Sequence, residues 1–449
     1  MLDALPLPPR PNIERYKKQA NELLMACKSD DPQTLPARLA EWLQAQLTID
    51  PALAGARRPY TPGEIAPRVR HGVERVMKHL GVTDSASHAA CTLARAQFAL
   101  AREFGFASWP EFARHVEALA APAHSPISAF EAAADAVVGG DVATLEKLLN
   151  EYPSLATDRS TREHGATLLH YVSANGVENY RQRTPPNIVQ IAQQLLRAGA
   201  DVNAESQAYG GRSTTLGLTA TSYHPEAAGV QLELLELLLE NGATIDPPDG
   251  GGSAVNGCLR NGRGQAAEFL AGRGARLDLE GASGVGRLDV VKSFVDGAGH
   301  LTSAATQPQM NAGFAWACEF GRTTVAAFLL QSGMDVDARL TQRGETGLHW
   351  AAYGAHVEIV ALLLERVPRI DTKDQRHQST PLEWAVFAWG NSGQSRRFDY
   401  YKVVAMLVRA GATPDPKWNE TPATPQSTAK KIQSDPHMQA ALRGQLLPP

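Results

Sequence analysis

Histidine and cysteine side chains are the first candidates for chemistry in this sequence, because metal binding and acid–base catalysis rely on them. None of the 13 histidines forms an HxxxH or HExxH pair, so we predict no metal site and no cofactor. The four cysteines are far apart in the sequence and form no CxxC motif, which predicts unpaired thiols in a reducing cytoplasm. Carboxylates are plentiful, but no spacing pairs them for acid–base work, and we expect no catalytic residue and no enzyme activity.

The composition limits the classes of molecule that the protein is expected to bind. The chain has 449 residues, a net charge of −4 and 43% hydrophobic residues, which argues against a protein that binds nucleic acid or anionic membranes. No apolar run approaches the length of a membrane span, and the first residues lack the apolar core of a secretory signal. We therefore expect a cytoplasmic, monomeric protein without a membrane partner.

The elements that would position any site follow an internal repeat. Residues 345–366 read ETGLHWAAYGAHVEIVALLLER, and the same register recurs upstream from Ala312 and downstream from Thr380. Most spacings lie near the value of about 33 that is typical of one repeat family, and the longer ones contain insertions. The starting positions of successive units are Glu131, Thr167, Thr215, Ser253, Leu277, Ala312, Thr346 and Thr380.

Turn motifs complete the pattern: TLLH at Thr167, TGLH at Thr346 and TPLE at Thr380, with helix ends such as GADVNA. In these motifs the sequence resembles the ankyrin-repeat family over residues 127–416. The resemblance implies an all-α solenoid of about eight helix-turn-helix repeats with short β-hairpin fingers. It also implies that His170 and His349 hydrogen-bond the threonine of their own turn, and that Cys258 and Cys318 occupy small buried positions.

Residues 1–125 do not share the repeat. Helical spacing predicts an N-terminal helical domain that resembles the leader of bacterial ankyrin proteins, with Ser108 as an N-cap and Gly105 as a helix stop. Residues 417–449 are expected to form a C-terminal capping tail of one or two helices. The predicted leader helices span 12–26, 36–46, 65–80, 87–104 and 109–119.

Aromatic residues recur in register within the repeats. Trp316, Trp350 and Trp384 occupy one position of three successive units, and Tyr171 occupies it further upstream. Stacked repeats bring equivalent positions into a row. Two interpretations stay open: the row packs one repeat against the next, or it anchors a partner, since Trp, Tyr and Arg dominate binding hot spots.

Three insertions separate the two helices of their repeats, at Glu178–Asn187, Ser222–Val230 and Trp389–Tyr401. Their Tyr and Arg content is typical of a recognition surface, although tolerated surface loops look alike. An alternative function is a small-molecule or catalytic pocket formed by the inserts of repeats two and three, near His170, Tyr171, Arg181 and His224. A third is that the leader domain is the effector and the repeats only target it.

The family resemblance implies a protein–protein interaction scaffold or adaptor that holds a protein partner in the concave groove and on the inserts. The residues predicted to contact the partner are Asn175, Tyr180, Arg181, Arg183, Tyr209, Arg212, Tyr223, His224, Glu319, Trp350, Tyr353, Phe387, Arg396 and Arg397.

Overall fold

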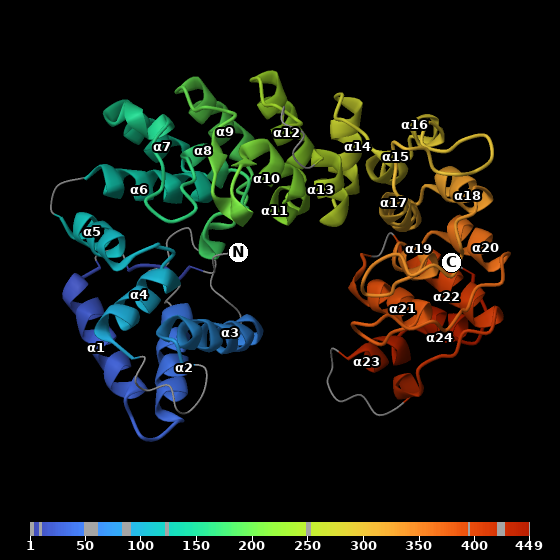
Figure 1. Cartoon of the computed structure of the whole chain (residues 1–449), viewed down its shortest axis with the longest axis horizontal. Helices are drawn as coiled ribbons and strands as arrows, with labels where there is room; N and C mark the ends of the chain where they lie inside the picture. Colours follow the sequence, from blue (N-terminus) through green and yellow to red (C-terminus); the bar gives the residue numbers. More distant parts are fainter. Residues whose placement is uncertain are drawn as a thin grey trace. The chain divides into compact units, whose positions relative to one another are not determined.

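The chain folds into two compact units, Met1–Ile245 and Asp246–Pro449, in a computed structural model (Figure 1). This division runs through the repeat region, and the three-part division expected from the sequence stays a prediction. The structure describes residues 4–8, 11–48, 62–82, 91–121, 125–247, 253–393, 396–419 and 427–448.

The N-terminal segment of the first unit is helical, as its apolar spacing predicts. Asn12 and Ser108 cap their helices by accepting the backbone N–H of Glu14 and Glu111, and Gly105 ends a helix in the left-handed region at φ +84°. Residues 87–90 of the predicted fourth helix lie outside the described residues. The five helices are α1 (Ile13–Cys27), α2 (Thr34–Leu47), α3 (Pro62–Leu80), α4 (Leu93–Glu103) and α5 (Trp109–Ala120).

The core of this segment is aromatic. Phe104 and Phe112 are buried and stacked with their ring centroids 5.1 Å apart. One expectation is wrong here: Cys27 and Cys91 are joined as a disulfide, with a Cα–Cα distance of 6.2 Å. The helices α1 and α4 bring together two thiols that are 64 residues apart in sequence, which no local spacing reveals. Cys258 is buried, as expected.

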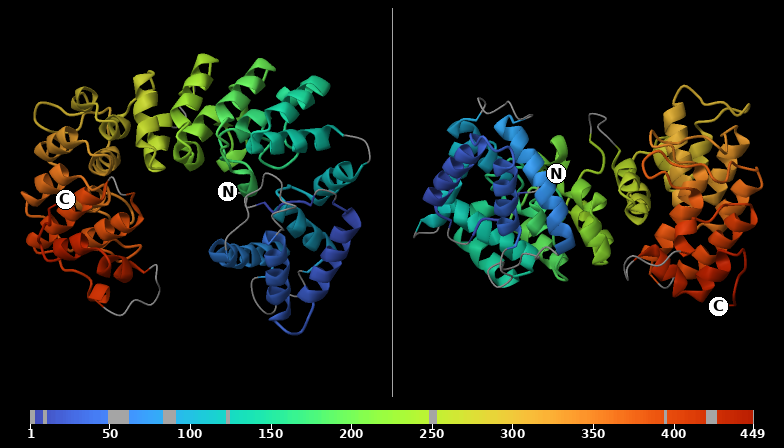
Figure 2. Two further views of the ribbon diagram at one scale, coloured as in Figure 1. Left: turned by 180° about the vertical axis from the view of Figure 1, so that it is seen from behind. Right: turned by 90° about the horizontal axis from the view of Figure 1, so that it is seen from below.

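Helix pairs follow one another through the repeat region, and Figure 2 shows them side by side within each unit. The first unit contains α6 (Pro126–Gly139) with α7 (Val142–Glu151), α8 (Leu168–Tyr171) with α9 (Ile188–Arg197), and α10 (Thr215–Thr221) with α12 (Gln231–Glu240). The second contains α13 (Ala254–Arg260) with α14 (Gly264–Gly272), α15 (Leu279–Gly284) with α16 (Leu288–Lys292), α17 (Gln307–Glu319) with α18 (Thr323–Gln331), α19 (Gly347–Tyr353) with α20 (Val357–Leu364), and α21 (Pro381–Asn391) with α22 (Arg397–Arg409). The predicted all-α solenoid of about eight helical repeats is confirmed.

Two histidines hold the start of a repeat in place. The Nδ1 of His170 accepts the backbone N–H of Thr167 at 3.1 Å, so its proton lies on Nε2, which donates to the carbonyl of Ser213 at 3.1 Å. His349 makes the same pair of bonds, to Thr346 within its own turn and to the carbonyl of Ser379. Because each ring bonds its own turn and the next one, these histidines are structural.

The connections differ from repeat to repeat. Within the described residues one β-hairpin finger forms paired strands, β1 (Glu205–Ser206) antiparallel to β2 (Ser213–Thr214). The insert at 222–230 contains the short helix α11 (Tyr223–Ala227). In the insert at 389–401, α21 continues to Asn391 and α22 begins at Arg397, and Trp389, Tyr400 and Tyr401 are buried.

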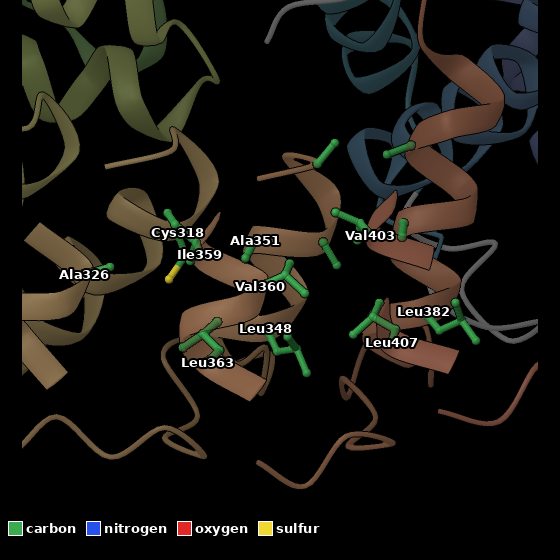
Figure 3. Packing of buried hydrophobic residues seen from close by; sticks show 14 of the residues in the cluster. Cys318, Ala326, Leu348, Ala351, Ile359, Val360, Leu363, Leu382, Val403 and Leu407 are labelled. Carbon is green, nitrogen blue, oxygen red and sulfur yellow. The ribbon is translucent and has the colours of Figure 1, made fainter. Parts of the chain in front are cut away.

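The core of the second unit is built from small and branched aliphatic side chains. Their compactness brings neighbouring helices close: a Cβ on Gly347 of α19 would lie 2.7 Å from the Phe314 ring of α17. Figure 3 shows side chains of α17 to α22 that pack together, among them Cys318, Ala326, Leu348, Ala351, Ile359, Val360, Leu363, Leu382, Val403 and Leu407.

Two short helices lie at the C-terminal end of the second unit, and the capping role expected for the tail stays a prediction. They are α23 (Thr428–Gln433) and α24 (Pro436–Ala441), and α24 packs against α22. Ile432, Met438 and Ala441 are buried in the same core as the repeats. Among the described residues, no helix combines the length and the apolar character that crossing a bilayer requires.

Candidate functional site

An aromatic row runs across the first helices of three successive repeats in the second unit. It consists of Trp316 on α17, Trp350 on α19 and Trp384 on α21. The centroid of Trp350 lies 5.8 Å from that of Trp316 and 5.2 Å from that of Trp384, both in edge-to-face geometry, which favours contact between indoles. All three side chains are half-buried.

Buried carboxylates fix the two outer indoles. Trp316 Nε1 donates to Glu280 Oε1 at 3.1 Å, and Trp384 Nε1 donates to Asp374 Oδ2 at 3.2 Å. Among the described residues, the buried Nε1 of Trp350 has no hydrogen-bond partner. The row therefore packs repeat against repeat, as the first interpretation holds, while the middle indole keeps an unsatisfied donor.

A second row lies about one helical turn further along the same helices. This outer row consists of Glu319, Tyr353 and Phe387, which recur with the same spacing as the three tryptophans. Phe387 is 61% exposed and Tyr353 is 39% exposed. Burial raises the pKa of Glu319 to about 7, and its buried Oε2 has no partner among the described residues.

The third insert borders the outer row. The hydroxyl of Tyr400 donates to the carbonyl of Tyr353 at 2.8 Å, and the guanidinium of Arg396 donates to the carbonyl of Gly354. Arg397 lies over the Trp389 ring, 5.7 Å from its centroid. The insert thus holds the backbone under Tyr353 and places Arg396, which is exposed, beside it.

The first insert is not the exposed loop that its composition suggests. Tyr180 and Arg181 are buried, with 2% and 0% of their surface exposed, so the expectation that they meet a partner at the surface is wrong. Arg181 is ion-paired with Glu131 at 2.9 Å and with Asp135 at 2.8 Å. A buried guanidinium needs such carboxylates, and α6 supplies them.

A network of four buried charges surrounds that insert. Arg162 pairs with Glu131 at 2.5 Å and with Glu178 at 2.9 Å, and Arg181 pairs with the same two carboxylates. Burial alone would raise the pKa of Glu131, but the charges of Arg162 and Arg181 outweigh it and lower that pKa to about 2. The same two cations hold the pKa of Glu178 well below its usual range.

The other predicted contacts of the first unit lie at its surface or at its edge. Asn175 accepts the hydroxyl of Tyr209 at 2.5 Å and donates to the carbonyl of Leu218 at 3.1 Å, which links two repeats. The exposed predicted contacts are Arg183, Tyr209, Arg212 and Tyr223, and the side chain of His224 is half-buried beside Tyr223.

A cavity of about 520 Å³ lies in the first unit. Its lining includes Glu178 of the first insert, the segment 207–210, Arg102, Glu163 and His164. Its lining contains none of the four residues expected around a pocket, because His170, Tyr171 and Arg181 bond within the repeats and His224 lies in the second insert.

Three residues at these sites could not be identified from the sequence. Glu280 and Asp374, which hold the indoles, and His164, which lines the cavity, belong to no motif, and only the fold brings them to these positions. Among the described residues, no group of three or more His, Cys, Asp or Glu side chains is arranged to hold a metal ion.

Comparison with known proteins agrees with the helix pairs. Residues 314–417 match a family model described as three copies of ankyrin repeats. This segment of the chain consists of ankyrin repeats. Ankyrin repeats are, in general, protein–protein interaction modules. The match covers the part of the ankyrin array that carries Trp350, Trp384 and the exposed Tyr353 and Phe387.

A solved structure, the crystal structure of the human ASB11 ankyrin repeat domain, is 19% identical to this chain. It covers 65% of this chain and 100% of its own, with a TM-score of 0.31. The search of curated proteins finds no match.

Proposed function

We propose that this ankyrin-repeat protein is a scaffold or adaptor that binds a protein partner on the surface formed by the aromatic row and the outer row. The observation that carries the proposal is the exposure of Phe387 and Tyr353, at 61% and 39%, next to three indoles that pack against one another. Exposed aromatic side chains on a rigid support are the usual anchors of protein interfaces.

Rigidity supports the same proposal. The indoles of Trp316 and Trp384 are held by hydrogen bonds, and the backbone of Tyr353 is held by Tyr400 from the third insert. A surface that is ordered before binding loses little conformational entropy when a partner arrives. The partner would cover Phe387 and Tyr353 and would approach Arg396 at the rim.

Three finer statements belong to the proposal: the protein performs no catalytic step, acts as a monomer and resides in the cytoplasm. The disulfide of Cys27 and Cys91 removes the argument from unpaired thiols for a reducing compartment. The cytoplasmic location therefore stays a prediction.

The test compares a Tyr353→Ser/Phe387→Ser double variant with the wild type in quantitative affinity purification from the native cell. Met25→Ser is the control, because Met25 is 71% exposed on the other unit and is not among the predicted partner contacts. We expect the double variant to recover the specific partners at least about tenfold less efficiently, which corresponds to about 1.4 kcal/mol. The control should recover them at the wild-type level.

A second measurement uses the indoles themselves. The purified partner should shift the tryptophan emission of the wild type to shorter wavelength, because docking removes water from half-buried indoles. Equal recovery by the double variant and the wild type would refute the proposed surface.

A further inference from the structure

Two neighbouring loops of the second unit carry a cluster of exposed cations. Finger A, residues 338–344, connects α18 to α19, and finger B, residues 372–378, connects α20 to α21. Among the described residues, no carboxylate forms an ion pair with any of these cations. The exposed cations of the two fingers are Arg339, Arg343, Lys373 and Arg376.

The acidic side chains next to these cations are buried. Asp374 of finger B is 0% exposed, and Glu345, which follows finger A, is 4% exposed. Asp374 accepts three backbone N–H groups within residues 376–379 and the indole N–H of Trp384. Glu345 accepts the hydroxyl of Thr341. Both carboxylates therefore bond within the protein, and the charged side chains that face outward on the fingers are cations.

Hydrogen bonds join the two fingers to each other. Arg339 Nη1 donates to a carbonyl of its own finger at 2.9 Å and to the carbonyl of Lys373 in finger B at 3.1 Å. The backbone N–H of Gln375 donates to the carbonyl of Arg343 at 2.6 Å. The side chains of Arg343, Lys373 and Arg376 take no part in these bonds, so their charges remain available to a partner.

The fingers are continuous with the aromatic row. Helix α21 begins soon after finger B, and Trp384, near its start, is bonded to Asp374. Phe387 lies about one turn further along the same helix. At the C-terminal end of α19, the exposed Arg396 donates to the carbonyl of Gly354. Cations therefore lie next to both ends of the helices that carry the aromatic residues.

We propose that the fingers and the aromatic residues bind an acidic segment of the protein partner, whose carboxylates pair with the finger cations while its apolar side chains cover Trp384 and Phe387. This inference rests on the proposed function and names the chemistry of the partner. Guanidinium groups form strong, often bidentate, hydrogen bonds with carboxylates. Complementary charge across an interface speeds association and selects among partners.

An acidic protein segment fits this surface better than a nucleic acid does. Proteins that bind nucleic acids usually carry a basic stripe that follows many phosphates. Here the cations are confined to two finger loops, and the whole chain has a net charge of −4. The exposed Phe387 beside them requires an apolar group as well as an anionic one.

The probes are three synthetic peptides of equal length, in which Phe and Leu alternate with Glu, with Gln or with Lys. Binding to the full chain is followed by the fluorescence anisotropy of the labelled peptide. We expect the Glu peptide to bind at least about tenfold more tightly than the Gln peptide. The difference should shrink at high salt, because ions screen exposed charges, and the Lys peptide should not bind.

Matched variants locate the acidic peptide on the fingers. Arg343→Glu/Arg376→Glu reverses two exposed charges, and Lys292→Glu/Arg443→Glu changes the net charge equally at exposed positions of the same unit outside the fingers. We expect the finger variant to bind the Glu peptide at least about tenfold more weakly than the wild type. The control should bind it within about threefold. The milder Arg343→Gln/Arg376→Gln, which removes the charges without adding carboxylates, should give an intermediate loss.

The Tyr353→Ser/Phe387→Ser variant separates this inference from the proposed function. If it loses the Glu peptide while the finger variant binds like the wild type, the aromatic surface stands and the acidic partner is overturned. Equal binding of the Gln and Glu peptides has the same meaning. If neither variant weakens binding, both proposals fail.

Two further results would overturn the acidic partner. One is absence of Glu-peptide binding to the wild type at about 0.15 M salt. The other is tighter binding of a single-stranded oligothymidylate than of the Glu peptide, abolished in the finger variant, which would identify a nucleic-acid surface.

Discussion

Acidification should lower the free energy of unfolding of the first unit, because two of its histidines are buried. His115 is fully buried, with Nδ1 hydrogen-bonded to Thr161 Oγ1 at 2.8 Å, and His170 is fully buried between two repeats. Burial lowers the pKa of each to about 4. In the unfolded chain both would titrate near a pH of about 6.5.

The difference between the folded and unfolded pKa values sets the sign and the size of the change in stability with pH. Below about pH 6.5 the two histidines of the unfolded chain bind protons, whereas those of the folded chain stay neutral until about pH 4. The free energy of unfolding therefore falls as the pH drops between these two values and levels off below them. Between pH 7 and pH 5 each histidine costs about 2 kcal/mol of unfolding free energy, or about 20-fold in the unfolding equilibrium.

The assay must report on the first unit separately. In the second unit, the raised pKa of Glu319 means that acidification increases the free energy of unfolding, which is opposite to the effect of the two histidines. Hydrogen exchange read by mass spectrometry, corrected for the intrinsic exchange rate, follows peptides of α5 and α8 separately. His115→Leu should remove about half of the pH dependence. The control His300→Leu changes a histidine side chain that is 80% exposed and should leave it unchanged.

Equal protection of these peptides at pH 7 and pH 5 in the wild type would refute the reasoning, as would an unchanged pH dependence in His115→Leu.

Three further changes have defined outcomes. As the pH falls from 7 to 5, the carboxyl of Glu319 should add about 2 kcal/mol to the free energy of unfolding of the second unit, and Glu319→Gln should abolish this gain. Hydrogen exchange of α17 peptides measures it, and an unchanged pH profile in the variant would contradict the raised pKa. Alkylation of the urea-unfolded chain before reduction should label two of the four cysteines. Cys91→Ala should destabilise the first unit by about 4 kcal/mol on urea denaturation, since the disulfide closes a loop between residues that are 64 apart in sequence. Gly284→Ala should cost about 1–3 kcal/mol in the second unit, because its Cβ would collide with Leu259; a wild-type urea midpoint would show that Leu259 moves aside freely.

Local patterns in the sequence predict local structure well in this chain. Ser108 caps α5, Gly105 ends the helix before it, and His170 bonds Thr167, because each of these contacts spans only a short stretch of chain. The regular register of the repeats also predicts the aromatic row, since equal spacing in a stacked array brings equal positions together.

Contacts between distant segments could not be predicted in the same way. Arg181 looks like a surface arginine until Glu131, which lies on α6 far upstream in the sequence, is placed against it. The disulfide of Cys27 and Cys91 depends on how α1 and α4 pack. The cavity depends on the pairing of Glu178 with residues that belong to no motif.

The hydrogen bonds that His170 and His349 make to the following repeat have a consequence for synthesis on the ribosome. His170 emerges 43 residues before the carbonyl of Ser213 that its Nε2–H requires, and His349 emerges 30 residues before Ser379. Until the following repeat has left the exit tunnel, each nascent repeat keeps one polar group that only water can satisfy. The array is therefore completed in one direction, and the last-made repeat at any moment is the one least able to hold its shape.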